Sequence, residues 1–500
     1  MISGRRIDSL LLDVQAFVLR GGWPVRLALV GACLVFGVVG GLLLSLANPL
    51  LLLAFLGGVA VGLAMLRSTQ LGLFALIAVV CLLPFAAVPI SIGFYPTFLD
   101  VVLLAVFGVW LARVFTRAQE GYVASPLDLP ILIFILLACV AFIAGSAHAG
   151  ITKDTARHFV EIIIAVSLFF VVTNSVRDYR RLRQILIVII LAGFVAALMG
   201  VVLYFLPHPL TVRLLSMLRV VHYPAGWEVL WFIEDNPDLP MRAISTAVNP
   251  NVLGGLLILI VTLTTPQMFA RKPLIPRKWL APMLAVMLIC LLLTFSRGAF
   301  VAIGAALLVL GVIRYRRLLP VLALVLLLIL ILPQTREYIV HLQEGLMLQD
   351  RATEMRLGEY KDALRLISRY PWFGVGFGGT PSIDIYIGVS NVYLLIAEEM
   401  GLVGLAAFLL IMGVFFAYAW TAWRRMERDA EAEPLLLGLA VALLGAMVGG
   451  ITDHYFFNLD FPHSVALFWL YAGLAVVTIK VANGEGTDRG PAESAKRSNF

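Results

Sequence analysis

The chain has 500 residues, of which 61% are hydrophobic and 13% are charged. Soluble domains contain about 25% charged residues, so this composition excludes a soluble globular protein. A net charge of +7 can indicate a nucleic-acid partner, but here the basic residues flank apolar stretches, which is typical of membrane proteins. We therefore expect the lipid bilayer as a partner and no nucleic acid.

Apolar runs recur throughout the chain, and each is long enough to cross roughly 30 Å of hydrocarbon. The runs are continuous rather than alternating, which favours helices over barrel strands. The sequence predicts an all-α, polytopic bundle of about 12–14 transmembrane helices. The predicted spans cover about residues 25–44, 48–66, 70–92, 97–115, 127–147, 158–174, 182–206, 245–265, 279–296, 297–313, 318–333, 391–422, 435–452 and 462–482.

Two predicted boundaries are short. Ala47-Asn48-Pro49 separates the first two spans, and Ser296-Arg297-Gly298 separates the spans at 279–296 and 297–313. Without both breaks the count becomes twelve and stays even, so both termini are expected on one side. With the N-terminus inside, 25 of the 37 basic residues fall in cytoplasmic segments, which supports this orientation.

The predicted spans divide the chain into four regions. Residues 1–333 hold N-terminal transmembrane helices with an outer loop at about 207–244, and residues 334–390 form a large extracytoplasmic loop. Residues 391–482 hold the C-terminal transmembrane helices, and residues 483–500 are expected to be a disordered cytoplasmic tail. The first apolar run lacks a small-residue cleavage site, so no cleaved signal peptide is expected. The four cysteines lie in apolar runs and are interpreted as packing residues.

The second outer loop has a recognisable pattern. Apolar residues recur at helical spacing over Met355–Ile367, which predicts an amphipathic helix ended by Pro371. A glycine-rich segment, 374–379, follows. Its N–H groups could cradle a phosphate, but it neither follows a strand nor precedes a Lys-Ser/Thr pair, so we favour a close turn beneath the next helix.

Three arginines of the outer side are candidates for anion binding. Arg297 lies between two apolar runs, and an ionisable residue at membrane depth indicates function unless it snorkels to the interface. Arg356 and Arg365 lie on the predicted amphipathic helix, where a solvated face or lipid headgroups are the alternative interpretations. A guanidinium fork binds pyrophosphate through two hydrogen bonds and stays charged.

Two further polar clusters lie near predicted outer helix ends. Asp453 and His454 end the span at 435–452, where histidine is a candidate general base and an interfacial aromatic belt is the alternative. Glu398 and Glu399 open the span at 391–422, where we expect them to bind an outer-loop arginine.

The order of several short motifs resembles the O-antigen ligase and polymerase superfamily. The resemblance covers roughly residues 285–410, and each motif alone is weak. The motifs are Asn249-Pro250-Asn251, Ser296-Arg297-Gly298-Ala299, Arg356 with Tyr360, Pro371 to Gly376, and Ser390-Asn391 followed by Glu398-Glu399, Gly401 and Gly404.

This resemblance implies glycosyl transfer at the outer face of a bacterial inner membrane, with both termini cytoplasmic. The donor would be a glycan on a polyprenyl pyrophosphate, and the acceptor lipid A, another glycan or a protein. The resemblance implies no metal and no other cofactor. Arg297 and Arg356 would bind the pyrophosphate with Arg365 as an auxiliary. The other expected substrate-binding residues are Tyr360, Ser390, Asn391 and Glu398.

One position departs from the ligase pattern. The ligases usually have His-Asn before the span that holds Gly401, whereas this chain has Ser390-Asn391. A serine cannot activate an acceptor hydroxyl unaided at neutral pH. Three explanations stay open: His454 with Asp453 replaces the base, Asp384 or Glu398 serves, or the chain is a polymerase, a permease or a binding protein.

The leading hypothesis is therefore a membrane glycosyltransferase of the ligase or polymerase type. A transporter of a small anion or lipid-linked sugar is the alternative, and a non-catalytic partner in envelope polysaccharide assembly is a third. A transporter needs polar residues along a path at mid-membrane depth, whereas charges such as Glu161 lie near outer helix ends.

Overall fold

The computed structural model describes residues 68–484, except 90, 92, 117–121, 149, 332–350, 379–388 and 428–429. Contacts divide the chain into two units, Met1–Arg67 and Ser68–Phe500, and the described residues belong to the second. The predicted spans 25–44 and 48–66, the break between them, Asp384 and the tail from 485 lie outside the described residues.

The described residues form helices, with isolated bridges in place of any extended strand, so the all-α prediction is confirmed. The helices before residue 270 are α4 (Thr69–Leu82), α5 (Phe98–Phe115), α6 (Asp128–Gly145), α7 (Lys153–Ser175), α8 (Tyr179–Phe205), α9 (His208–Ser216) and α10 (Pro250–Thr264). Those that follow are α11 (Arg277–Leu293), α12 (Arg297–Ile313), α13 (Leu318–Ile331), α15 (Arg351–Arg369), α16 (Val392–Arg425), α17 (Glu433–Gly449) and α18 (Pro462–Ala482).

Seven of the described helices are long and apolar enough to cross a membrane: α5, α6, α7, α8, α16, α18, and α10 with its 3-10 extension to Met268. Several shorter apolar helices, among them α4, α12 and α17, pack with them. A polytopic helical membrane bundle, as predicted from the sequence, fits this arrangement.

Some predicted span boundaries were wrong for local reasons. The span at 70–92 ends at Leu82, because Pro84 cannot continue the backbone hydrogen-bond pattern of a helix. The span at 245–265 begins its α-helix only at Pro250, after a short 3-10 turn. The break near Ser296 is real, since Phe295 has a left-handed φ of 51° between α11 and α12.

The centre of the bundle is formed by α10 and α18, which are buried on nearly every side. Helix α18 packs against α7 and α17, and α10 packs against α17 and α12. Both helices are apolar around their circumference, as buried helices are. The peripheral helices α5 and α6 instead expose apolar side chains such as Leu104, Leu129 and Ile143, as lipid-facing surfaces do.

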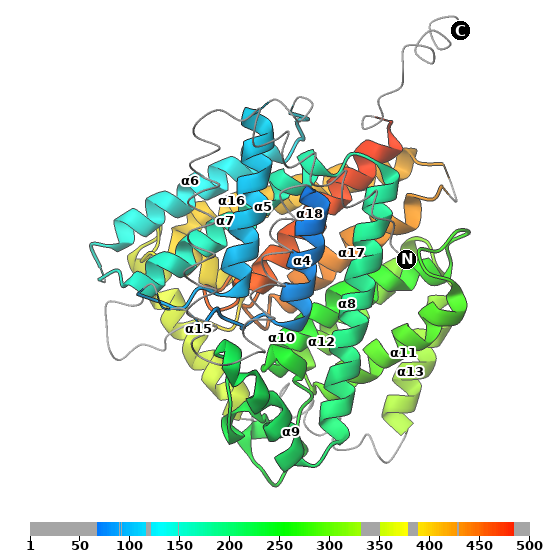
Figure 1. The fold of residues 1–500 in the computed structure, drawn as a ribbon, viewed down its shortest axis with the longest axis horizontal. Helices are drawn as coiled ribbons and strands as arrows, with labels where there is room; N and C mark the ends of the chain where they lie inside the picture. The colour runs from blue at the N-terminus through cyan, green and yellow to red at the C-terminus, as the bar shows by residue number, and fades with distance from the viewer. Residues whose placement is uncertain are drawn as a thin grey trace, which may run out of the picture. The chain divides into compact units, whose positions relative to one another are not determined.

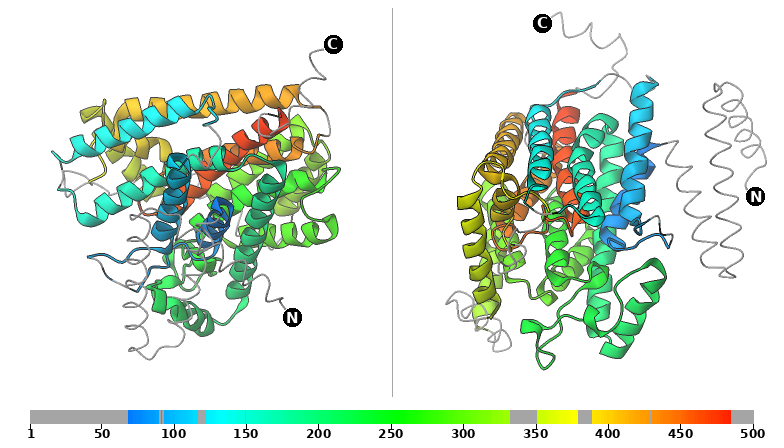
Figure 2. Two further views of the ribbon diagram at one scale, coloured as in Figure 1. Left: turned by 45° about the horizontal axis from the view of Figure 1, so that its top comes forward. Right: turned by 90° about the vertical axis from the view of Figure 1, so that its left-hand side faces the viewer.

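Segments predicted to be cytoplasmic meet at one end of the bundle. Glu431 pairs with Lys272 (2.6 Å) and Arg183 (3.9 Å), and Glu433 pairs with Arg314 (2.7 Å). The segments predicted to be outer lie toward the opposite end, where α9 and α15 are found, away from the C-terminal end of α18 (Figures 1 and 2). The loops that the sequence assigns to one side of the membrane therefore lie at one end of the bundle.

The two outer segments contain regular structure. Residues 207–244 fold as α9 and short 3-10 helices around an apolar cluster that includes Leu215, Leu230 and Met241. The amphipathic helix predicted at Met355–Ile367 is confirmed as α15, which ends at Arg369 before Pro371.

A backbone break at Gly401 shapes α16. Gly401 has φ 70°, and a Cβ there would lie 2.2 Å from the carbonyl oxygen of Trp372. The chain after α15 docks at this break: Leu402 N donates to Pro371 O (2.7 Å), and Val375 N donates to Glu398 O (2.8 Å). The predicted close turn beneath the next helix is confirmed.

We predict that Gly401→Ala lowers the free energy of unfolding by about 2 kcal/mol or more, because alanine is strained at positive φ and would collide with backbone. Thermal unfolding in detergent measures the change. Gly413→Ala is the matched control on α16, since nothing lies within 4 Å of its added Cβ. Equal unfolding midpoints for the two variants would contradict this account of the break.

Candidate active site

Helix α10 begins at the predicted Asn249-Pro250-Asn251 motif. Asn249 Oδ1 accepts hydrogen bonds from the backbone N–H groups of Asn251 (2.8 Å) and Val252 (3.3 Å) and thereby caps the helix. Pro250 takes the first helical position, where a missing N–H is harmless. The side chain of Asn251 is left to contact a different element.

That contact is with Arg242, which the sequence analysis did not select. Its Nε donates to the backbone carbonyl of Thr294 (2.8 Å), and its Nη2 donates to Oδ1 of Asn251 (2.7 Å). One guanidinium thus joins the outer segment to the end of α11 and the start of α10. Arg242 lies seven residues before Asn249, and this closeness to the motif was the indication of its importance that the sequence offered.

Arg242 lies in the electric field of two other arginines. Burial lowers its pKa to about 10, the charge of Asp453 opposes that shift, and the charges of Arg356 and Arg297 add to it. We call Arg242, Arg297 and Arg356 the arginine cluster. They come from the outer segment before α10, the start of α12, and α15 (Figure 1).

The segment after α17 reaches the start of α12. A Cβ at Gly298 would collide with Oγ1 of Thr452, so a larger residue there would require the Thr452 side chain to move. Asp453, the next residue, is partly buried, and burial raises its pKa while His454, Arg356 and Arg242 lower it. The predicted residues Arg297, Arg356 and Asp453 therefore do come together.

This arrangement favours an anionic ligand. The charges of Arg242 and Arg356 both act on the single carboxylate of Asp453, and the charge of Arg297 acts on Arg242. The N-terminus of α12 adds the positive end of a helix dipole beside Arg297. Each arginine is partly exposed, so an external ligand can reach the cluster.

Ser390 and Asn391 join three elements next to this cluster. Asn391 caps α16 and donates from Nδ2 to the carbonyl of Ile451 (2.8 Å). The Tyr360 hydroxyl lies 3.1 Å from both that carbonyl and the carbonyl of Ser390, and Glu359 accepts a hydrogen bond from Ser390 N (2.8 Å). Burial raises the pKa of Tyr360, which keeps its hydroxyl a donor at neutral pH.

Two predicted substrate-binding residues lie apart from the arginine cluster. Arg365 is nine residues after Arg356, which places it on the opposite side of α15, and it pairs with Asp362 at 3.0 Å. Glu398 is buried beneath the turn that follows α15, and no arginine among the described residues forms an ion pair with it. Their roles stay predictions.

His454 is oriented by an amide rather than by Asp453. Oδ1 of Asp453 accepts from the backbone N–H of His454 (2.9 Å), while Nδ1 of the ring lies 2.6 Å from Nδ2 of Asn458. Asn458 Oδ1 accepts from Asp460 N (2.7 Å), so the Asn458 amide group is the donor to His454. In neutral His454 the proton then lies on Nε2, which makes that nitrogen a donor.

The glycine-rich segment does not present a phosphate cradle over residues 374–376. The N–H groups of Gly374, Val375 and Gly376 donate to the carbonyls of Tyr370 (3.2 Å), Glu398 (2.8 Å) and Glu399 (3.0 Å). These donors are therefore committed to the protein backbone, and Gly379 lies outside the described residues.

We predict that Arg242→Lys lowers the free energy of unfolding by about 1.5–3 kcal/mol, because a lysine ammonium cannot reproduce both guanidinium hydrogen bonds. Arg365→Lys is the control: Arg365 is 70% exposed, and its ion pair should contribute at most about 1 kcal/mol. Thermal unfolding of both variants checks this. An Arg242→Lys protein as stable as the control would show that Arg242 does not hold these segments together.

Comparison with known proteins supports the resemblance. Residues 282–409 match the family model described as O-antigen ligase. No curated protein matches the chain. The matched segment contains Arg297, Arg356 and Asn391, whereas Arg242 and Asp453 lie outside it. Residues 282–409 are thus similar to the O-antigen ligase family model, and this similarity is consistent with a protein of the O-antigen ligase and polymerase superfamily.

Proposed function

We propose that the protein is a glycosyltransferase that moves a glycan from a polyprenyl-pyrophosphate carrier to an acceptor at the outer face of the inner membrane. The domain match supports ligase-type glycan transfer in envelope polysaccharide assembly. The observation that carries the finer proposal is the arginine cluster at the end of the bundle that holds the outer segments.

The cluster suits the leaving group of this reaction. Breaking the bond between the sugar and the pyrophosphate leaves negative charge on the phosphate oxygens, and fixed guanidinium groups stabilise that charge. Arg297 and Arg356 would contact the pyrophosphate directly. Arg242, held by Thr294 and Asn251, would add positive charge and fix the start of α10. We propose that these arginines, rather than a metal ion, supply the charge.

The reaction we propose is a direct displacement. The acceptor hydroxyl oxygen forms a bond to the anomeric carbon, and the bond from that carbon to the pyrophosphate oxygen breaks with its electron pair. Polyprenyl pyrophosphate leaves, and the configuration at the anomeric carbon inverts. Asn391 and the Nε2–H group of His454 are proposed to hydrogen-bond the sugars, and the hydroxyl proton must pass to a general base.

The location supports a lipid-linked donor. The carrier's polyprenyl chain needs lipid, while its pyrophosphate and glycan need water and polar groups. Sites at outer helix ends meet both needs, because apolar faces of α5 and α6 are exposed along the bundle and the arginines lie at its end. The acceptor, whether lipid A, another glycan or a protein, would approach from the aqueous side.

We predict that Arg297→Ala and Arg356→Ala each lower kcat/KM for transfer by about 10²–10³-fold, because each removes fixed positive charge from the leaving group. The assay uses purified full-length protein, a polyprenyl-pyrophosphate oligosaccharide and candidate acceptors. Arg369→Ala, also on α15, is the control: its guanidinium lies over the Tyr370 ring, and it should transfer as wild type does.

The same assay separates the competing functions. Transfer that survives both arginine substitutions would refute the proposed site. Glycolipid binding by the wild type without transfer to any acceptor would support a binding partner instead. Passage of the glycolipid or of a small anion across vesicles, again without transfer, would support a transporter.

A further inference from the structure

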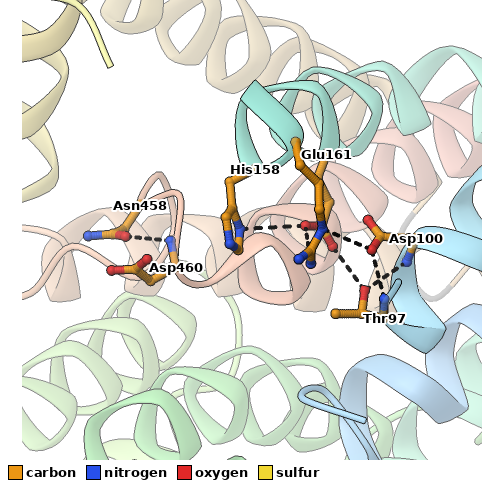
Figure 3. A network of polar contacts seen from close by, with 7 residues as sticks. Thr97, Asp100, His158, Glu161, Asn458 and Asp460 are labelled. Carbon is orange, nitrogen blue, oxygen red and sulfur yellow. Dashed lines mark hydrogen bonds and ion pairs between the residues drawn. The ribbon is translucent and has the colours of Figure 1, made fainter. Parts of the chain in front are cut away.

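A second polar cluster lies at the outer ends of α5 and α7 (Figure 3). Thr97 and Asp100 form a capping box at the start of α5. Arg157 of α7 pairs with Asp100 at 3.2 Å and with Glu161 at 3.6 Å. His158, the residue after Arg157, lies between Glu161 and the turn that holds Asp460 (Figure 3).

Glu161 is the most buried member of this cluster, at 3% exposure. Its Oε1 accepts from the Thr97 hydroxyl at 3.3 Å. Its Oε2 has no hydrogen-bond partner among the described residues and faces Nδ1 of His158 at 3.7 Å, a nitrogen that also has none. Two complementary buried atoms therefore face each other just beyond hydrogen-bond distance.

This contact selects the tautomer of His158. When Glu161 is ionised beside Arg157, its carboxylate can only accept, so Nδ1 of His158 carries the proton as the pair closes and the lone pair of the neutral ring lies on Nε2. The His158 side chain is 28% exposed, which leaves the ring accessible to a substrate. Pairs of a base and its orienting acid are often long in the absence of substrate and shorten when it binds.

The two outer histidines thus differ in chemistry. The Asn458 amide leaves Nε2 of His454 protonated, whereas Glu161 leaves Nε2 of His158 able to accept a proton. One short segment, from Asp453 to Asp460, connects the two histidines to the arginine cluster. At its start, Asp453 is influenced by the charge of Arg356, and at its end Asp460 lies on the His158 side (Figure 3). A sugar bound over this segment could contact both ends.

We propose that His158 is the general base of the transfer reaction and that Glu161 positions it. This inference rests on the proposed function and supplies the base that Ser390 cannot provide. As the acceptor oxygen bonds to the anomeric carbon, its proton moves to Nε2 of His158. The carbon–oxygen bond to the pyrophosphate breaks at the same time, and the leaving group keeps the electron pair.

Several carboxylates near His158 favour the imidazolium that this step creates, namely those of Asp100, Asp154, Glu161 and Asp460, while burial of the ring and the charge of Arg157 oppose it. The Glu161 carboxylate, 3.7 Å from Nδ1, is the group that would hydrogen-bond the ring as its positive charge forms. Glu161 acts through His158 and is a positioning residue.

The test compares His158→Ala with wild type in the transfer assay. We expect kcat to fall by about 10²–10⁴-fold while binding of the donor glycolipid stays within about threefold, and we expect added imidazole to restore part of the rate. Glu161→Gln, which keeps a hydrogen-bond acceptor but removes the charge, should lower kcat by about tenfold and shift the pH profile of kcat. His208→Ala, an exposed histidine of the outer segment, is the control with wild-type activity.

Each outcome is decisive. A wild-type protein without transfer activity would refute the proposed function itself. Active wild type with a His158→Ala variant within threefold of its rate would overturn the base assignment alone. Loss in His158→Ala that imidazole does not restore, together with wild-type kcat and pH profile in Glu161→Gln, would show a structural role and would also overturn it. An equally large loss in His454→Ala with imidazole rescue only there would assign the base to His454.

Discussion

The outer end of this bundle depends on placing a positive guanidinium, Arg242, among buried backbone. Its hydrogen bonds to Thr294 and Asn251 hold the end of α11 and the start of α10 together, and α12 begins shortly after this junction, at Arg297. Buried charge is unfavourable unless it is paired or hydrogen-bonded. The nearby carboxylate of Asp453 compensates part of the charge, and the remaining excess is what an anionic ligand can use. The same positive charge of Arg242 therefore matters both for holding these segments together and for the proposed binding of an anion.

The two polar clusters divide the proposed reaction between leaving group and nucleophile. In this proposal, guanidinium groups stabilise the departing pyrophosphate, and the pair of His158 and Glu161 would remove the proton of the attacking hydroxyl. The base that Ser390 cannot provide would then come from α7, on a different element. The turn from Asp453 to Asp460 connects the two clusters, and Thr452, the residue before this turn, packs closely against Gly298. Small displacements of this turn would therefore affect both steps.

Much of the fold was predictable, because hydrophobic runs and helix caps are local signals. The sequence located α12 from Arg297, α15 around Met355–Ile367 and α18 at 462–482. The motif order also assigned Arg297 and Arg356 to one site, and Asp453 was selected separately, with His454, near the outer end of a predicted span. The sequence could not find Arg242, whose importance lies in contacts with distant Thr294 and Asn251. The pairing of His158 with Glu161 was equally hidden, since the tautomer depends on which group faces each ring nitrogen. Arg365 suited the site by residue type, but the helical spacing of α15 places it on the side opposite Arg356, where it pairs with Asp362, and its auxiliary role stays a prediction.

The most direct test of the central claim is the affinity for polyprenyl pyrophosphate compared with polyprenyl monophosphate, measured on wild-type protein and on a variant carrying both Arg297→Ala and Arg356→Ala. The arginine cluster predicts that wild type binds the pyrophosphate at least about tenfold more tightly, a difference of about 1.4 kcal/mol, and that the double variant loses this preference. Equal affinity of wild type for the two lipids, or an undiminished preference in the double variant, would contradict the assignment of these arginines to the pyrophosphate.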